Sequence, residues 1–175
     1  MDSGMISKIE KAMLYAKEPG RISFNTFSLS FDGDNHEHTV NYNLGQWHCD
    51  CAYFHTNGIC SHTMTMERIL PGSVKPAESH HTPYVDSGII SKVEKAMLYA
   101  KERDRLNFNH FKATFQGDHK LHEIAYNSGA WQCNCDYSHT HGVCSHTMTL
   151  ERVLDSSVKP AEMITAAVME PVYAN

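Results

Sequence analysis

Trp47-His48-Cys49-Asp50-Cys51, followed after eight residues by Cys60-Ser61-His62, is the stretch that decides the fold of this chain. The arrangement returns as Trp131-Gln132-Cys133-Asn134-Cys135 and, again after eight residues, Cys144-Ser145-His146. All six cysteines of the chain lie in these two clusters. Three thiolates and one imidazole within a short stretch are typical of a tetrahedral zinc site. The sequence therefore predicts two zinc ions per chain, with these ligands: Cys49, Cys51, Cys60 and His62, and then Cys133, Cys135, Cys144 and His146.

The spacing of these residues suits a shared ion. Cys49 and Cys51 point to the same side if they lie on a strand, because side chains alternate along a strand with a period of two. Cys60 is predicted to lie just before a helix, with His62 in the first turn, because residues two apart inside a helix diverge. The intervening residues include Gly58, which lets the chain double back.

The two clusters belong to a longer repeat. A shift of 84 residues aligns Cys49 with Cys133 and Asp2-Ser3-Gly4 with Asp86-Ser87-Gly88 without gaps, which indicates duplication and the same fold twice. Units of this size have a marginal hydrophobic core, and a structural zinc stabilises them. The predicted organisation is as follows: repeat 1 over residues 1–70, a linker over 71–84, repeat 2 over 85–154, and a C-terminal tail over 155–175. Loss of one metal is then expected to leave the other repeat loaded.

Hydrophobic patterning predicts an α+β fold for each repeat: a helix, a three-stranded antiparallel meander, a zinc knuckle and a second helix. Apolar residues at helical spacing mark the first helix: Ile6, Ile9, Met13 and Ala16, and in repeat 2 Ile90, Val93, Met97 and Ala100. The alternation over residues 21–31 changes phase near Asn25-Thr26, which predicts a bulge in the first strand.

Charge and composition limit the partners. The chain has a formal net charge of −5, and no basic footprint of non-specific nucleic-acid binding is visible. Lysines and arginines of the first helix of each repeat could still form a local patch: Lys8, Lys11, Lys17 and Arg21, or Lys92, Lys95, Lys101, Arg103 and Arg105. The first residues do not resemble a signal peptide, no apolar run approaches membrane length, and thiolate ligands require reducing conditions. We expect a cytoplasmic protein without a membrane partner.

The pattern C-x-C, a variable loop and C-x-H resembles the SWIM-type zinc finger family. The resemblance rests on the eight predicted ligands, about fourteen residues per repeat, and on the strands and helix predicted around them. It implies zinc binding and interaction with DNA or protein. The helicase-like or transposase domains that often accompany such fingers have no counterpart here.

Two functional classes remain open. The first is a non-enzymatic interaction module for protein or nucleic acid, because four protein ligands leave zinc no open position for catalysis. No nucleophile, phosphate-loop or paired-carboxylate motif accompanies the clusters, so we expect no catalytic residues, no organic cofactor and no small-molecule substrate. The alternative is an iron–sulfur or redox-sensing thiolate protein that uses the same ligands. Iron–sulfur proteins of the CDGSH type also use three cysteines and a histidine, but their histidine follows the last cysteine by four residues rather than by the two found here.

Overall fold

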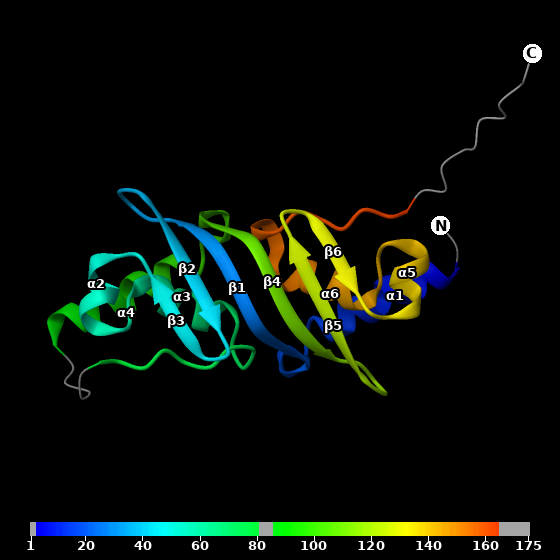
Figure 1. Cartoon of the computed structure of the whole chain (residues 1–175), viewed down its shortest axis with the longest axis horizontal. Helices are drawn as coiled ribbons and strands as arrows, with labels where there is room; N and C mark the ends of the chain where they lie inside the picture. Colours follow the sequence, from blue (N-terminus) through cyan, green and yellow to red (C-terminus); the bar gives the residue numbers. More distant parts are fainter. Residues whose placement is uncertain (1–2, 81–85, 165–175) are drawn as a thin grey trace, which may run out of the picture.

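A computed structural model describes residues 3–80 and 86–164 of the chain (Figure 1). Both repeats contain the predicted helix, meander, knuckle and helix, which confirms the α+β class. The elements of the first repeat are α1 (Ser3–Tyr15), β1 (Ile22–Asp32), β2 (Glu37–Asn43), β3 (Gln46–Cys49), α2 (Ala52–Asn57) and α3 (Ser61–Ile69). Those of the second are α4 (Ser87–Tyr99), β4 (Leu106–Gln116), β5 (Leu121–Asn127), β6 (Ala130–Cys133), α5 (Asp136–His141) and α6 (Ser145–Leu154). Short 3₁₀ turns cover Pro19–Arg21, Arg103–Arg105 and Asp155–Ser157.

The first strand contains the predicted bulge. The pairing of β1 with β4 shifts register between Phe24 and Thr26, where the hydrophobic alternation changes phase. The extra residue keeps Ile22 and Phe24 on the same buried face as Phe27, so both halves of the strand contribute to the core. The short helices α2 and α5 inside the knuckles were not predicted.

The two repeats share one sheet. Its strand order is β3-β2-β1-β4-β5-β6, so β1 and β4 pair antiparallel at its centre (Figure 1). Phe27 lies opposite Phe111, its own counterpart in the repeat, and Ile22 lies opposite Phe115 just as Phe31 lies opposite Leu106. Such self-complementary pairing is that of a two-fold axis through the middle of the sheet. The repeats are therefore halves of one sheet, which differs from the expectation of two separate zinc-stapled units.

A group of phenylalanines closes the centre of the core. Phe24 lies edge-on to Phe111 with ring centroids 5.4 Å apart, and Phe27 lies edge-on to Phe108 at 5.6 Å. Each contact joins one repeat to the other, and all four rings are at most 3% exposed. Burial of rings of this size stabilises a fold by several kcal/mol. The two repeats therefore depend on each other for their hydrophobic core.

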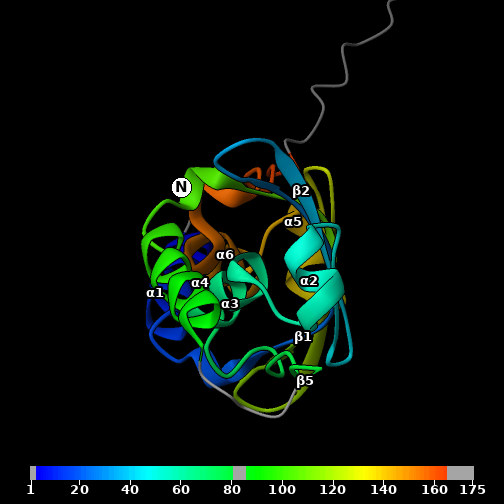
Figure 2. The same ribbon diagram turned by 90° about the vertical axis from the view of Figure 1, so that its left-hand side faces the viewer.

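The first helix of each repeat packs on the opposite repeat. Helix α1 lies against α6, and α4 lies against α3. Figure 2 shows these four helices together on one side of the sheet. Tyr15 at the end of α1 contacts Phe115, with ring centroids 5.3 Å apart, and Tyr99 at the end of α4 contacts Phe31 at the same distance. The helices are thus exchanged between the repeats.

Polar contacts fix each exchanged helix at the far repeat. Lys11 on α1 forms an ion pair with Asp118 in the turn between β4 and β5, at 2.7 Å. Lys95 on α4 forms the equivalent pair with Asp34, also at 2.7 Å. The lysine holds the pKa of each aspartate below its usual value by hydrogen bonding. These side chains are exposed, so each pair adds little stability, but together they set which turn each helix contacts.

The buried face of these helices is not the predicted apolar stripe. Helix α1 buries Met5, Ala12 and Tyr15, whereas Ile6 and Met13 are 46% and 54% exposed. Ile90 and Met97 are similarly exposed on α4. The physical reason is the surface that each helix meets. The small Ala12 allows close approach to the other repeat, and the long Tyr15 reaches into its core. The regularly spaced apolar residues Ile6 and Met13 therefore face outward.

Candidate metal centre

Each metal centre lies where a strand meets the N-termini of two helices. Strand β3 ends at Cys49, and Cys51 is the residue that precedes α2. Gly58, in the left-handed conformation, ends α2 and lets the chain turn back. Cys60 then precedes α3, and His62 lies in its first turn, as predicted. Cys51 keeps an extended backbone but lies just beyond the strand on which it was expected.

The predicted ligands come together in two groups. Their sulfur and nitrogen atoms lie within 4.8 Å of one another in each group: Cys49, Cys51, Cys60 and His62, and Cys133, Cys135, Cys144 and His146. Nδ1 of His62 lies 3.5 Å from Sγ of Cys49 and 3.8 Å from Sγ of Cys60. The matching distances at His146 are both 3.7 Å. Ideal tetrahedral zinc with ordinary bond lengths puts sulfur and nitrogen about 3.6 Å apart. The two sites therefore fit two zinc ions per chain, each with Nδ1 of the histidine facing the metal.

Helix N-termini support the negative charge of the thiolates. The backbone N–H of Phe54 donates to Sγ of Cys51, and that of Thr63 donates to Sγ of Cys60, both at 3.4 Å. The Thr63 hydroxyl also accepts from the backbone N–H of Cys60 at 3.1 Å, which completes a capping box. The second repeat has the same bonds from Ser138 to Cys135 and from Thr147 to Cys144. Each cysteine is thus both a helix cap and a candidate metal ligand.

The clustered thiols do not titrate independently. Hydrogen bonding to Cys51 and Cys60, together with burial, raises the pKa of Cys49 well above its ordinary value. In the second repeat, hydrogen bonding to Cys144 and burial raise the pKa of Cys133. The same hydrogen bond lowers the pKa of Cys144 to about 3. Burial and the mutual repulsion of adjacent negative charges therefore oppose the ionisation of all three thiols in a metal-free cluster.

Zinc binding is expected to release protons and to weaken as the pH falls. The metal requires three thiolates, whereas burial and hydrogen bonding raise the pKa of Cys49 and Cys133 in the free clusters, so protons leave when zinc binds. Their release becomes more costly at low pH, so zinc should dissociate on acidification from about pH 8 to pH 5. Calorimetric titration in buffers of different ionisation enthalpy measures the protons released. An affinity that is constant over this pH range would contradict the three-thiolate assignment.

Aromatic rings enclose each metal-binding histidine. The His62 ring lies 4.7 Å from Phe31 and 4.5 Å from His38, measured between centroids. Tyr99, from the exchanged helix, stacks parallel to His62 at 6.2 Å. The second site has the same surroundings: Phe115 at 5.0 Å, His122 at 4.0 Å and Tyr15 at 6.4 Å from His146. Each site is therefore completed by a tyrosine from the opposite repeat.

Sequence reasoning missed these enclosing residues. Tyr15 and Tyr99 occupy matched positions of the repeat, as the ligands do, but nothing in a local pattern connects either tyrosine to a metal in the other half. Trp47 packs on Tyr42, with ring centroids 4.8 Å apart, and its indole N–H donates to the carbonyl of Lys75 at 2.8 Å. The tryptophan anchors the segment that follows α3.

Comparison with known proteins decides the kind of zinc site. Residues 38–68 and 122–155 match the model of the SWIM zinc finger. Both repeats contain a SWIM zinc finger. Each matched segment includes the second and third strands of its repeat, the knuckle and the helix after it, so the predicted resemblance is confirmed twice. The first helix and first strand lie outside both SWIM segments. Comparison with curated proteins and with solved structures gives no match.

Proposed function

We propose that this chain is a non-enzymatic interaction module in which two SWIM zinc sites hold a shared binding scaffold. The observation that supports this role is the closed ligand set. Each site provides four buried protein ligands, and a zinc ion bound by all four has no position left for water or substrate. The metals then stabilise the fold, and function lies on the surface that they hold in shape.

A protein is the partner that the charges favour. The chain has a formal net charge of −5, and each zinc with three thiolates adds a further negative charge. Two lysines of the candidate basic patch contact the opposite repeat: Lys11 binds Asp118, and Lys8 lies 5.0 Å from the centre of the Tyr137 ring. Arg21 donates to the carbonyl of Gln116 at 2.9 Å. These groups are engaged in joining the halves, which leaves fewer of them for phosphate.

The cysteines support a reducing compartment. All six are free thiols in the structure, and zinc binding requires that they stay reduced. In the described ranges, no helix has the length and apolar character needed to cross a bilayer. Because the thiols must stay reduced, we propose that the module works in the cytoplasm.

A salt series distinguishes the candidate partners. Zinc-loaded protein is mixed with labelled single- and double-stranded DNA and RNA at increasing salt, and metal content is measured on the same sample. We expect no binding that weakens steeply with salt, because such a slope reports contacts with phosphates. Tight, salt-sensitive binding that disappears on chelation would instead assign the module to nucleic acid.

The visible spectrum of the same sample tests the alternative use of the ligands. Zinc thiolates are colourless, whereas an iron–sulfur cluster in the same residues absorbs visible light. We expect a colourless protein with two zinc ions per chain. A brown protein that contains iron would assign the sites to redox chemistry.

A further inference from the structure

The outer strand of repeat 2 has an unpaired edge. Strand β6 pairs with β5 on one side only, and it is the last strand of the sheet. The backbone N–H of Asn134 donates to the carbonyl of Glu123. Because inward and outward backbone groups alternate in an antiparallel pair, those of Trp131 and Cys133 point away from β5. Within residues 3–80 and 86–164 they have no backbone partner. They form an open ladder for one more strand.

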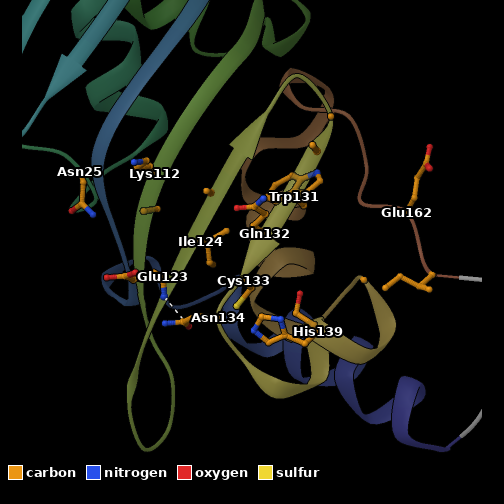
Figure 3. A pocket seen from close by; sticks show the side chains of 17 residues that line it. Asn25, Lys112, Glu123, Ile124, Trp131, Gln132, Cys133, Asn134, His139 and Glu162 are labelled. Carbon is orange, nitrogen blue, oxygen red and sulfur yellow. Dashed lines mark hydrogen bonds between the residues drawn. The ribbon is translucent and has the colours of Figure 1, made fainter.

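A hollow lies beside this edge. It has a volume of 990 Å³ and extends from the polar outer face of β4 and β5, past β6, to α5 and the tail. Figure 3 shows the tail at Glu162 running apart from β6. The tail is held at both ends of this gap: the Trp131 indole donates to the carbonyl of Lys159 at 2.8 Å, and the N–H of Ile164 donates to the carbonyl of His141 at 2.9 Å. Residues 159–164 therefore bound the space beside β6, and hydrogen bonds hold this segment at both ends.

The equivalent place in repeat 1 carries larger side chains. Gln132 and Ser138, which line the hollow, correspond to His48 and Phe54. The His48 ring lies 6.0 Å from Phe54 and 5.9 Å from His55, so aromatic rings cover that part of the first knuckle. Replacement of two rings by short polar side chains gives repeat 2 a surface that its copy lacks. The two edges are therefore not equivalent, although the repeats share their fold.

The charge of the hollow indicates the side chains that it suits. Glu123 and Glu162 line it and are both exposed, and neither carboxylate forms an ion pair with another described residue. Lys112 is the one lysine in the lining. Extended segments bind strand edges through their backbone, and side chains that alternate above and below give specificity. A segment with lysine or arginine matches the excess of carboxylates here.

We propose that β6 binds an extended, basic segment of a partner protein as a seventh strand of the sheet. This inference rests on the proposed interaction function and names the surface that performs it. The segment exchanges backbone hydrogen bonds with Trp131 and Cys133, and its lysine or arginine side chains lie over Glu123 or Glu162. The hollow left by Gln132 and Ser138 accepts the side chains that face the polar side of the sheet.

A displayed library of random ten-residue segments, selected on the zinc-loaded chain, tests this assignment. The enriched segments are expected to carry lysine or arginine and to bind the double variant Gln132→His, Ser138→Phe at least about tenfold more weakly. This variant introduces only residues that repeat 1 already accommodates at the same positions, and its zinc content and circular dichroism show whether it folds. The matched control, His48→Gln, changes an exposed side chain at the other edge and should bind normally.

Methylation of single backbone nitrogens in an enriched peptide tests strand addition itself. Alternate residues of an added strand direct their N–H groups to β6, so methylation should abolish binding at every second position and leave the positions between unaffected. Replacement of Glu123 and Glu162 by glutamine should remove the preference for basic segments.

Several results would overturn the inference. Segments that bind the chain and the Gln132→His, Ser138→Phe variant equally use another surface, which would leave the proposed interaction function intact. Insensitivity to N-methylation would exclude strand pairing. If the chain associates with itself and the Gln132→His, Ser138→Phe variant does not, the strand that binds β6 comes from a second copy of the chain. If no segment is enriched, this inference fails, and nucleic acid that binds with a steep salt dependence would then replace protein as the partner of the module.

Discussion

Chelation of zinc is expected to unfold both halves of the chain in one transition. Structural zinc contributes roughly 10–16 kcal/mol per site in finger peptides, as much as the whole stability of an ordinary small domain. Because β1 and β4 form the centre of one sheet and the core phenylalanines cross between repeats, neither half keeps a complete core alone. Circular dichroism and tryptophan fluorescence during titration with a chelator measure the transition, since Trp47 and Trp131 report on separate repeats.

The Cys60→Ser variant provides the sharper form of this test. Independent units would lose the first metal and keep the second unchanged, as the sequence suggests. The shared sheet predicts instead that the second site also becomes weaker, because its half has lost an ordered neighbour. Two separate transitions on chelation, or an unaltered second site in the variant, would show that the halves are energetically independent.

Replacing Tyr15 with alanine is expected to weaken the metal site of repeat 2, not that of repeat 1, to which Tyr15 belongs in sequence. The ring is 4% exposed, lies against Phe115 and stacks on His146. Truncation of a buried ring of this size costs roughly 3–5 kcal/mol. Rates of thiol alkylation, followed by mass spectrometry of the cysteine peptides, show which site has opened. Cys133, Cys135 and Cys144 should react faster than in the unaltered chain.

Tyr99→Ala is the matched control, and it should produce the opposite pattern. Its ring stacks on His62, so Cys49, Cys51 and Cys60 are the thiols expected to become reactive. Each variant is thereby the control for the other, in the same protein and with the same chemical change. Faster reaction of Cys49, Cys51 and Cys60 in Tyr15→Ala would show that α1 packs on its own repeat.

The metal sites and the meander were predictable because their determinants are local. Two cysteines two residues apart, at the end of a strand and just beyond it, and a cysteine and histidine at a helix start fix the ligand geometry within a few residues. The change of hydrophobic phase near Asn25 similarly located the bulge. Both signals depend on spacing alone, and the structure places these residues accordingly.

The exchange of helices was not predictable, and the repeat itself explains why. Because the two copies are so similar, α1 meets nearly the same residues on its own repeat and on the other one. Local sequence patterns cannot distinguish packing within a repeat from packing between repeats. Which repeat α1 packs on depends on how β1 and β4 pair and on the direction of the chain after α1. Both are properties of the whole fold. The outward apolar face of Ile6 and Met13 has the same origin.

The sequence shows the side chains that form the hollow beside β6 only as two differences between the repeats, and it does not show their structural effect. Ser138 in place of Phe54 and Gln132 in place of His48 can be read from an alignment of the repeats. Their effect depends on α5 and the tail enclosing a free edge, which no local pattern specifies.

The exchanged helices also bear on the symmetry of the chain. The first helix and the first strand of each repeat both pack on the other repeat, so neither has its present partner in a single copy. Two copies related by a two-fold axis provide these partners for each other, and Phe27 then lies opposite its own counterpart, Phe111. One polypeptide therefore has the symmetry of a homodimer. Because its two halves are encoded separately, each can differ from the other, as Gln132 and Ser138 differ from His48 and Phe54.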